Sequence, residues 1–180
     1  MIEIIKSTTV LGIIHNGETV IGADGQATMG NTIAKSTVKK IRTFEEGKVV
    51  TGFAGSTADA FSLLDNFEGK LKGFRGNMRR AAIELAKEWR TDRYLRKLEA
   101  MMLVGSKDEL LLISGTGDVL EPDSQVAAIG SGSMYALSAA LALKKHAPDL
   151  SAEEIVREAL TIAADICIYT NHNFTIEKVK

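Results

Sequence analysis

Three short polar stretches near the start of the chain carry side chains that could do hydrolytic chemistry. They are Thr8-Thr9, Asp24-Gly25-Gln26 and the lysine pair 39–40. A threonine hydroxyl is a weak acid and attacks a carbonyl only when a neighbouring base accepts its proton. Each stretch also has an ordinary structural explanation, because threonine suits strands, Asp-Gly suits turns and lysine suits a solvated edge.

The common catalytic and cofactor motifs do not occur in the sequence. Gly130-Ser131-Gly132 lacks the G-x-S-x-G spacing of a nucleophile elbow, and neither glycine-rich phosphate-binding motif is present. We therefore expect that the chain does not bind ATP itself. His15, His146 and His172 are far apart and lack the spacing of zinc ligands, which favours surface or turn positions for them.

Length and composition favour one globular domain. The chain has 180 residues, of which 45% are hydrophobic, enough to bury a full core. A formal net charge of -1 argues against nucleic acid as a partner. The single cysteine, Cys167, fits a reducing compartment and also fits a small buried apolar side chain. No stretch reaches the roughly 18 apolar residues that span a bilayer, and residues 1–7 lack the features of a signal peptide. We expect a cytoplasmic protein that does not enter a membrane.

Apolar segments alternate with turn signals along the whole chain. The first two flank the hairpin-type pair Asn16-Gly17. Several segments are apolar at consecutive positions, which predicts sheets covered on both faces. The predicted strands span 8–14, 19–23, 38–44, 49–53, 101–105, 110–114, 119–120, 126–129 and 174–179.

Four blocks have helical periodicity. The first opens at Ser56, the second runs from Asn77 through Leu98, the third follows Gly132, and the fourth runs from Ser151 to about Tyr169. The order is strands, two helices, strands, two helices and a last strand. Two sheets packed face to face, each with a helix pair outside, would bury every apolar face. This order predicts an α/β protein with a four-layer α/β/β/α sandwich.

The polar stretches stand in the order and spacing of a known family, the bacterial proteasome-like peptidases HslV (ClpQ), which the chain resembles after residue 7. Any one shared string is weak, but seven in order are specific. They lie at 8–10, 22–32, 39–40, 52–55, 84–93, 128–132 and 165–171. The resemblance implies an N-terminal-nucleophile hydrolase with the fold of a proteasome β-subunit and the activity of a threonine protease.

The resemblance also implies roles for five residues. Thr8 would be the nucleophile once it is N-terminal, with its own α-amine as base. Lys40 would lower the pKa of that amine, and Asp24 would orient Lys40. The backbone N–H of Gly52 would face the oxyanion, and Ser131 would hydrogen-bond near the amine. Thr9 competes with Thr8 for the role of nucleophile, because adjacent strand residues face opposite sides.

The same resemblance suggests a site for a monovalent cation such as Na⁺. Its ligands would be the main-chain oxygens of Ala164, Cys167 and Thr170. Alanine at 164 and serine at 133 stand where the family often has glycine. The basic run of Arg90, Arg93, Arg96 and Lys97 would line an axial pore, or it is a solvated helix face.

Family likeness further implies the assembly and the maturation of the chain. Residues 1–7 would be a leader removed autocatalytically, leaving 8–180 as one peptidase domain. Subunits would form two stacked hexameric rings, activated allosterically by the hexameric ATPase HslU (ClpY), and would degrade unfolded proteins with ATP spent by that partner. Two alternatives stay open: a noncatalytic ring subunit and an amidohydrolase acting on a small amide.

Overall fold

The structure is a computed structural model that describes residues 5–6, 8–55, 57–93, 95 and 100–180. Its first long strands are β2 (Thr9–His15) and β3 (Glu18–Ala23), which pair antiparallel. Asn16 and Gly17 connect them with positive φ angles of 50° and 76°. Two such residues in a row match the right-handed twist of the flanking strands, so the predicted hairpin is confirmed.

Two antiparallel sheets form the centre of the molecule. One has the order β10-β9-β8-β7-β6 and the other the order β11-β2-β3-β12. The 3₁₀ turn η1 (Glu45–Gly47) lies between β6 and β7 in the chain. The remaining strands are β6 (Ile41–Phe44), β7 (Val49–Ala54), β8 (Met101–Gly105), β9 (Leu110–Ser114), β10 (Val119–Leu120), β11 (Val126–Gly130) and β12 (Thr175–Lys178).

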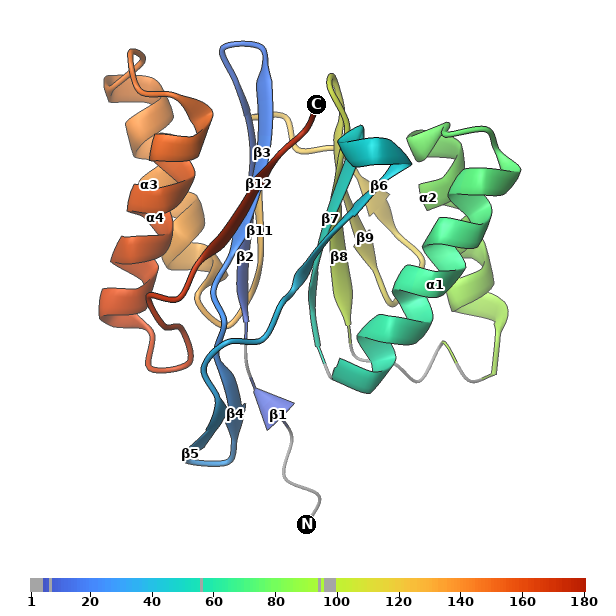
Figure 1. Ribbon diagram of the computed structural model, residues 1–180, viewed down its shortest axis with the longest axis horizontal. Coiled ribbons are helices and arrows are strands. Elements are labelled where there is room, and N and C mark those ends of the chain that lie inside the picture. The colour runs from blue at the N-terminus through green and yellow to red at the C-terminus, as the bar shows by residue number, and fades with distance from the viewer. Residues whose placement is uncertain (1–4, 7, 56, 94, 96–99) are drawn as a thin grey trace.

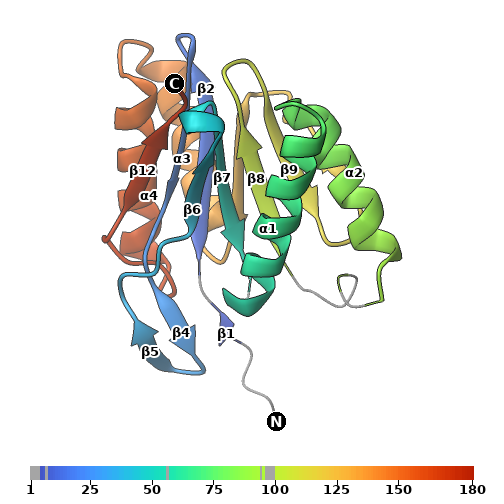
Figure 2. The ribbon, with the colours of Figure 1, turned by 45° about the vertical axis from the view of Figure 1, so that its right-hand side comes forward.

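Each sheet carries a pair of helices on its outer face (Figure 1). Helices α1 (Thr57–Gly73) and α2 (Met78–Thr91) cover the five-stranded sheet, and α3 (Ser133–His146) and α4 (Ala152–Ile166) cover the four-stranded sheet. A view turned by 45° shows the same layers (Figure 2). The predicted four-layer α/β/β/α sandwich is confirmed.

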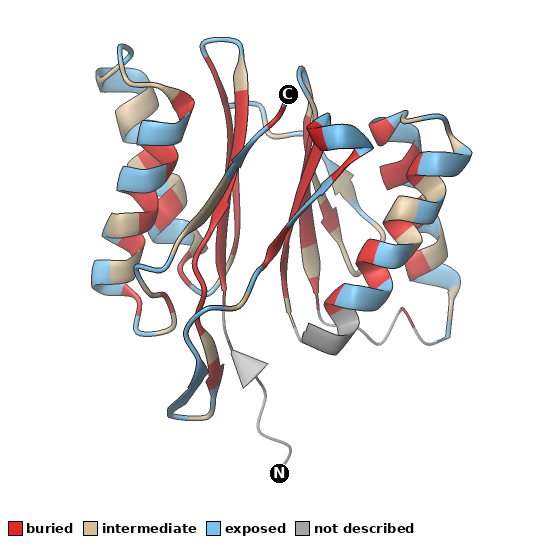
Figure 3. Cartoon of the chain, viewed as in Figure 1, coloured by how far each residue is buried: buried red, intermediate tan, exposed pale blue. Residues whose placement is uncertain are grey.

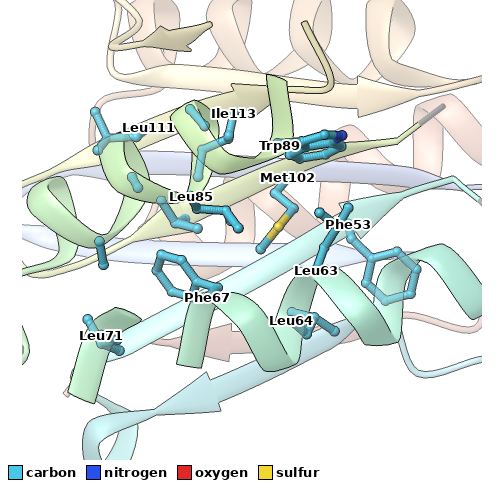
Figure 4. Close-up of a cluster of buried hydrophobic side chains, with 14 of the residues drawn as sticks. Phe53, Leu63, Leu64, Phe67, Leu71, Leu85, Trp89, Met102, Leu111 and Ile113 are labelled. Atoms are coloured by element: carbon cyan, nitrogen blue, oxygen red, sulfur yellow. The ribbon is translucent and has the colours of Figure 1, made fainter. Parts of the chain in front are cut away.

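Apolar side chains fill all three spaces between the layers. Under α1 and α2, Phe67, Leu85, Trp89 and Met102 are fully buried in one cluster (Figure 4). Burying a side chain of that size contributes about 1.5–3 kcal/mol to stability. A second cluster lies under α3 and α4, and a third lies between the sheets. The strands β2, β3 and β7 are accordingly buried along most of their length, while the outer helix faces are exposed (Figure 3).

The helix boundaries differ from prediction at their C-terminal ends. Helix α2 ends at Thr91, not near Leu98, because Asp92 is extended and its carboxylate accepts from Leu95 N at 2.9 Å. Residues 96–99 and Ser56 lie outside the described ranges. Helix α4 ends at Ile166, not near 169, and its predicted capping box of Ser151 with Glu154 is confirmed.

A third, small sheet was not predicted. It consists of β1 (Ile5–Lys6), β4 (Ala27–Met29) and β5 (Thr32–Lys35), in the order β1-β4-β5. It lies beyond one end of the sandwich (Figure 1). These strands are two to four residues long, so they lack the alternating pattern that identifies a strand. Residues 38–40, predicted as strand, instead precede β6.

Candidate active site

The two sheets bring the polar stretches together at the end of the sandwich where β1 and β4 lie. Thr8 immediately precedes β2, Asp24 follows β3, and Lys40 precedes β6. Strand pairing sets Thr9 opposite Gly130 at the end of β11. Residues that are distant in the sequence therefore meet because each stands at the same end of its strand.

Asp24 is the centre of this group. Its carboxylate is almost fully buried and accepts four hydrogen bonds. Oδ1 accepts from Lys40 Nζ at 2.9 Å and from Thr9 N at 2.8 Å. Oδ2 accepts from Gln26 N at 2.9 Å and from Asn171 N at 3.2 Å. A buried carboxylate held by this many donors has a fixed orientation.

Lys40 is a buried lysine, with 2% of its side chain exposed. Its ammonium donates to Asp24 Oδ1 and, at 2.7 Å, to the carbonyl of Gln26. These bonds engage two of its three N–H groups. Burial lowers the pKa of Lys40 from its ordinary value, although the charge and the hydrogen bond of Asp24 oppose that shift. The expectation that Asp24 pairs with Lys40 agrees with this geometry.

Thr8 stands at the junction between the residues before β2 and the strand itself. It is 1% exposed, and its φ angle is 113°. A positive φ is costly for a β-branched residue, so the backbone is strained at this residue. Its carbonyl accepts from Ser131 N at 2.8 Å, which holds the residue against the end of β11. The backbone of Ser131 thus contacts the candidate nucleophile.

Thr9 is the first residue of β2, whereas Thr8 lies just before the strand. The Thr9 hydroxyl is fully buried, accepts from Gly132 N at 3.0 Å and lies 2.7 Å from the hydroxyl of Thr170. A hydroxyl used in this way within the protein is not free to attack a substrate. Of the two adjacent threonines, the geometry favours Thr8 as the reactive one.

Gly52 requires a correction. It lies in the middle of β7 with a strand paired on each side. Because Phe53 N donates to Lys40 O, the preceding N–H points to the opposite side, toward Leu103 of β8. An added Cβ at Gly52 would lie 2.5 Å from Val10 Cγ1. Gly52 therefore lets the two sheets pack closely, and its N–H belongs to the sheet, not to an oxyanion site.

The predicted cation ligands lie at and just after the end of α4. Ala164 is in the last turn, where helix carbonyls lack intrahelical partners. Thr170 N donates to Cys167 O at 3.0 Å, so the chain forms a tight turn between these two residues. Carbonyl oxygens on one tight loop suit a hard monovalent cation, so these three residues are suited to bind such an ion. Among the described residues, no three histidine, cysteine or acidic side chains form a metal-binding group.

Two residues of the site were missed at the level of individual roles. Asn171 donates from its backbone to Asp24, accepts from Gly25 N at 3.1 Å and donates to Ser36 O at 2.9 Å. Gln26 supplies the carbonyl that accepts from Lys40. Each of these contacts involves a main-chain atom, and a pattern of residue types cannot reveal main-chain contacts. Only the family strings containing these residues pointed toward them.

The other candidates lie apart from the site. Arg90 is in the last turn of α2 and Arg93 is exposed beyond it, whereas residues 96–97 lie outside the described ranges. His15 is buried and lies 3.3 Å from the carbonyl of Pro148, and His172 pairs with Asp165 at the surface. No helix among the described residues is long and apolar enough to cross a membrane.

A pocket of about 820 Å³ adjoins the site. Thr28 and Met29 of β4 form part of one wall, and Lys39 and Ile41, the neighbours of Lys40, form part of another. β1 pairs with the same two β4 residues, Ile5 opposite Met29 and Lys6 opposite Thr28. The strand that leads toward Thr8 therefore runs beside this pocket.

The fold and the site place the chain in one class of protein. The model of a family described as proteasome subunits matches residues 4–179. A proteasome-type domain is the class to which both the layered sandwich and the family model assign this chain.

Comparisons with curated proteins narrow the class. The chain is 73% identical over 175 residues to the ATP-dependent protease subunit HslV of Cytophaga hutchinsonii, covering 97% of each chain. It is 70% identical over 175 residues to the protein of the same name from Amoebophilus asiaticus, covering 97% of this chain and 98% of that one. The chain belongs to the HslV family of proteasome subunits.

Solved structures agree with this assignment. HslV from Trypanosoma brucei superposes with a TM-score of 0.90 at 44% identity, covering 96% of this chain and 99% of the other. A protein described as BPH from Thiobacillus denitrificans has a TM-score of 0.74 at 23% identity, covering 96% and 97%. The second likeness shows the shared fold alone.

Proposed function

We propose that the chain is the proteolytic subunit of an ATP-dependent protease and that Thr8 is its nucleophile. The observation that carries this assignment is the single Asp24 oxygen that accepts from both Lys40 Nζ and Thr9 N. That oxygen ties the buried cation to the backbone immediately after Thr8. Lys40 and Thr8 are therefore held in a fixed relationship, as nucleophile activation requires.

The reaction begins once Thr8 is N-terminal. Its hydroxyl oxygen attacks the substrate carbonyl while the α-amine accepts the hydroxyl proton. The carbon–nitrogen bond of the tetrahedral intermediate then breaks, and the ammonium returns the proton to the departing amine. Water hydrolyses the resulting ester and frees Thr8. An ordinary α-amine has a pKa of about 7.7–8.0, and the nearby charge of Lys40 favours its neutral form.

The end of β7 offers a better oxyanion donor than Gly52. Gly55 follows the last residue of β7 and has a φ angle of 144°, so its N–H lies beyond the sheet ladder. The preceding Ala54 is near Thr8, since a Cβ built on Gly130 would lie 3.5 Å from Ala54 Cβ and 1.9 Å from Thr8 O. We assign the N–H of Gly55 to the developing oxyanion.

β4 supplies the substrate-binding edge. β1 occupies that edge as an antiparallel partner, and β5 covers the other side. Removal of residues 1–7 would expose backbone groups of β4 to which an extended substrate can add as a strand. The adjacent pocket would then accept a substrate side chain. An unfolded polypeptide fits this edge, because a folded chain presents few free extended segments.

Removal of the leader uses the same hydroxyl, although Thr8 N is still an amide and cannot yet act as a base. The Thr8 hydroxyl oxygen would attack the preceding carbonyl, the amide bond to Thr8 N would break, and that nitrogen would take up the hydroxyl proton. Water would then hydrolyse the resulting ester and cut the chain before Thr8. The positive φ of Thr8 strains the backbone immediately after the bond that must break, which would favour cleavage. The product is a chain that begins Thr8-Thr9-Val10 and carries a free amine.

The carbonyls of Ala164, Cys167 and Thr170 would hold a monovalent cation such as Na⁺. The cation would supply fixed positive charge that neutralises converging carbonyl dipoles. Within the chain, the hydrogen bond from Thr170 N to Cys167 O keeps this loop closed beside Asn171 and Asp24.

The energy for unfolding would come from a partner. The sequence lacks a phosphate-binding loop, while the curated relatives are named ATP-dependent protease subunits. We propose a hexameric ATPase of the HslU (ClpY) type as that partner, two stacked hexameric rings as the assembly, and the cytoplasm, where ATP is available, as the location.

Intact mass and peptide hydrolysis test this function together. The purified assembly should contain chains that begin at Thr8 and cleave a fluorogenic peptide amide, and an unfolded protein should be degraded only with the ATPase and ATP. A chain that retains residues 1–7 and hydrolyses nothing even with the ATPase would instead identify a noncatalytic ring subunit.

A further inference from the structure

The proposed mechanism leaves one buried pair of hydroxyl groups without a role. Thr9 Oγ1 and Thr170 Oγ1 are 2.7 Å apart, and the two residues are 0% and 5% exposed. They are separated by 161 positions in the sequence. Burying a hydroxyl group is unfavourable unless it forms a hydrogen bond, and here each hydroxyl bonds to the other, so the pair is a specific connection between two distant segments.

The connection also includes the start of α3. Gly132, the N-cap of α3, donates its N–H to Thr9 Oγ1 at 3.0 Å. An added Cβ at Gly132 would lie 2.3 Å from Thr9 Oγ1 and 2.7 Å from Thr170 Oγ1. The absence of a side chain at 132 is therefore what allows the two hydroxyls to meet.

Asp24 binds the backbone N–H and the backbone carbonyl of Thr9. The N–H of Thr9 donates to Asp24 Oδ1 at 2.8 Å, and its carbonyl accepts from Asp24 N at 3.1 Å. The loop that carries Thr170 also brings Asn171 N to Asp24 Oδ2. Thr9 and Asp24 are thus fastened to the same loop, and Lys40 is fastened to Asp24.

We propose that the Thr9–Thr170 hydroxyl pair positions the nucleophile by fixing the first residue of β2 against the loop after α4. Thr9 and Thr170 are positioning residues that act through Thr8 and contact no substrate. This inference rests on the proposed role of Thr8. Loss of the Thr9 hydroxyl would leave the Gly132 N–H and the Thr170 hydroxyl without a partner. The start of β2 would shift, and with it the distance between the Thr8 hydroxyl and its activating groups.

Steady-state kinetics of the assembled protein with a fluorogenic peptide amide test the proposal. Variants should be produced with Thr8 exposed directly by removal of a cleavable tag, so that self-processing is not needed. Thr9→Val keeps the shape but removes the hydroxyl. We expect kcat to fall about 10- to 100-fold with KM within about twofold, as for a misplaced catalytic group. Thr9→Ser should restore most of kcat.

Thr170→Val should lower kcat in the same way, and Thr170→Ser should restore it. Because both valine variants break the same hydrogen bond, the double variant should lose little more activity than the worse single variant. Thr19→Val is the matched control: Thr19 is also buried, and its hydroxyl donates to Lys107 O at the far end of the β2–β3 hairpin. It should lower the melting temperature without changing kcat.

Several outcomes would overturn the proposal. These are a folded Thr9→Val enzyme with unchanged kcat, a Thr9→Ser enzyme as slow as Thr9→Val, or fully additive losses in the double variant. If Thr9→Val does not assemble, the comparison of Thr170→Val with Thr170→Ser tests the proposal instead. Equal kcat in those two variants would reject a positioning role for the hydroxyl pair. A Thr8→Ala enzyme that still hydrolyses the peptide would reject the proposed function itself, which is a separate result.

Discussion

Lys40 Nζ lies 2.9 Å from Asp24 Oδ1, and the two side chains are 2% and 0% exposed. A buried ion pair is a poor source of stability, because the desolvation of two charges consumes most of the attraction between them. The pair is therefore better explained by its contact with the backbone N–H of Thr9, immediately after Thr8, than by a structural need. Variants of the two residues separate these two explanations.

Thr8→Ala should abolish peptide hydrolysis and leave the fold intact, because only the nucleophilic hydroxyl is lost. The variant should also retain residues 1–7, which intact mass would reveal. Thr8→Ser keeps a hydroxyl and should retain part of the peptide hydrolysis and part of the removal of residues 1–7. Clean removal of the leader from a pure Thr8→Ala preparation would assign the cleavage to another residue or another protease.

Lys40→Met should lower the rate of peptide hydrolysis by at least about 100-fold, the usual contribution of a positioned acid–base group. It also leaves the Asp24 carboxylate buried without its cation, which should cost about 3–5 kcal/mol of unfolding free energy. Denaturant unfolding of the assembled protein measures that cost. A rate near that of the wild type would show that Lys40 has no part in activating Thr8.

The double variant Lys40→Met with Asp24→Asn should be inactive yet more stable than Lys40→Met alone, because it buries no unpaired charge. Stability should not return fully, because an amide at position 24 can accept from Thr9 N or from Gln26 N and Asn171 N, but not on both sides. Recovered stability without activity would show that the pair is kept for chemistry. A double variant as unstable as Lys40→Met alone would instead give the pair a structural role.

The pH dependence of stability should carry a contribution from Lys40. Burial lowers the pKa of Lys40 in the folded protein below the ordinary value of a lysine. Between the lowered and the ordinary pKa, the unfolded chain binds the proton and the folded chain does not. The Lys40 contribution to unfolding free energy should therefore increase as the pH rises through that window. The difference between wild type and Lys40→Met, measured from pH 7 to 10, isolates this contribution.

A synthetic peptide with the sequence of residues 1–7 should inhibit the mature enzyme competitively. β1 pairs with β4 in the unprocessed chain, so the freed edge of β4 should accept the same segment from solution. KM for a peptide substrate should rise while kcat stays constant. The same peptide with N-methylated backbone amides is the control, since it cannot donate to β4. Equal inhibition by both peptides would argue against binding as a strand.

The layers could be predicted from sequence alone, because long apolar segments indicate which strands and helices are buried. The consecutive apolar residues of β2 and β3 imply burial on both faces, and the stripe ending at Trp89 fits a helix against a sheet. The strands β1, β4 and β5 went unpredicted because two to four residues are too few to establish a period.

The site was predictable to the level of side-chain types and no further. Thr8, Asp24 and Lys40 came from the family resemblance, and Asp24 and Lys40 do meet in the structure. The choice of Gly52 was wrong because the direction of a backbone N–H depends on which strands pair on either side, which one glycine in a sequence does not reveal. The contacts of Asn171 and Thr170 could not be predicted either, because they join segments that lie far apart in the sequence.

The late position of Thr170 and Asn171 has a consequence for the cell that makes this protein. Translation delivers Thr9 161 residues before Thr170, and the bond from Asn171 to Asp24 spans 147 residues. A nascent chain on the ribosome therefore holds a threonine, a lysine and an aspartate long before the loop that fastens them has been made. The hydrogen bonds that fix Thr9 and Asp24 to this loop can therefore form only after residue 171 has been synthesised.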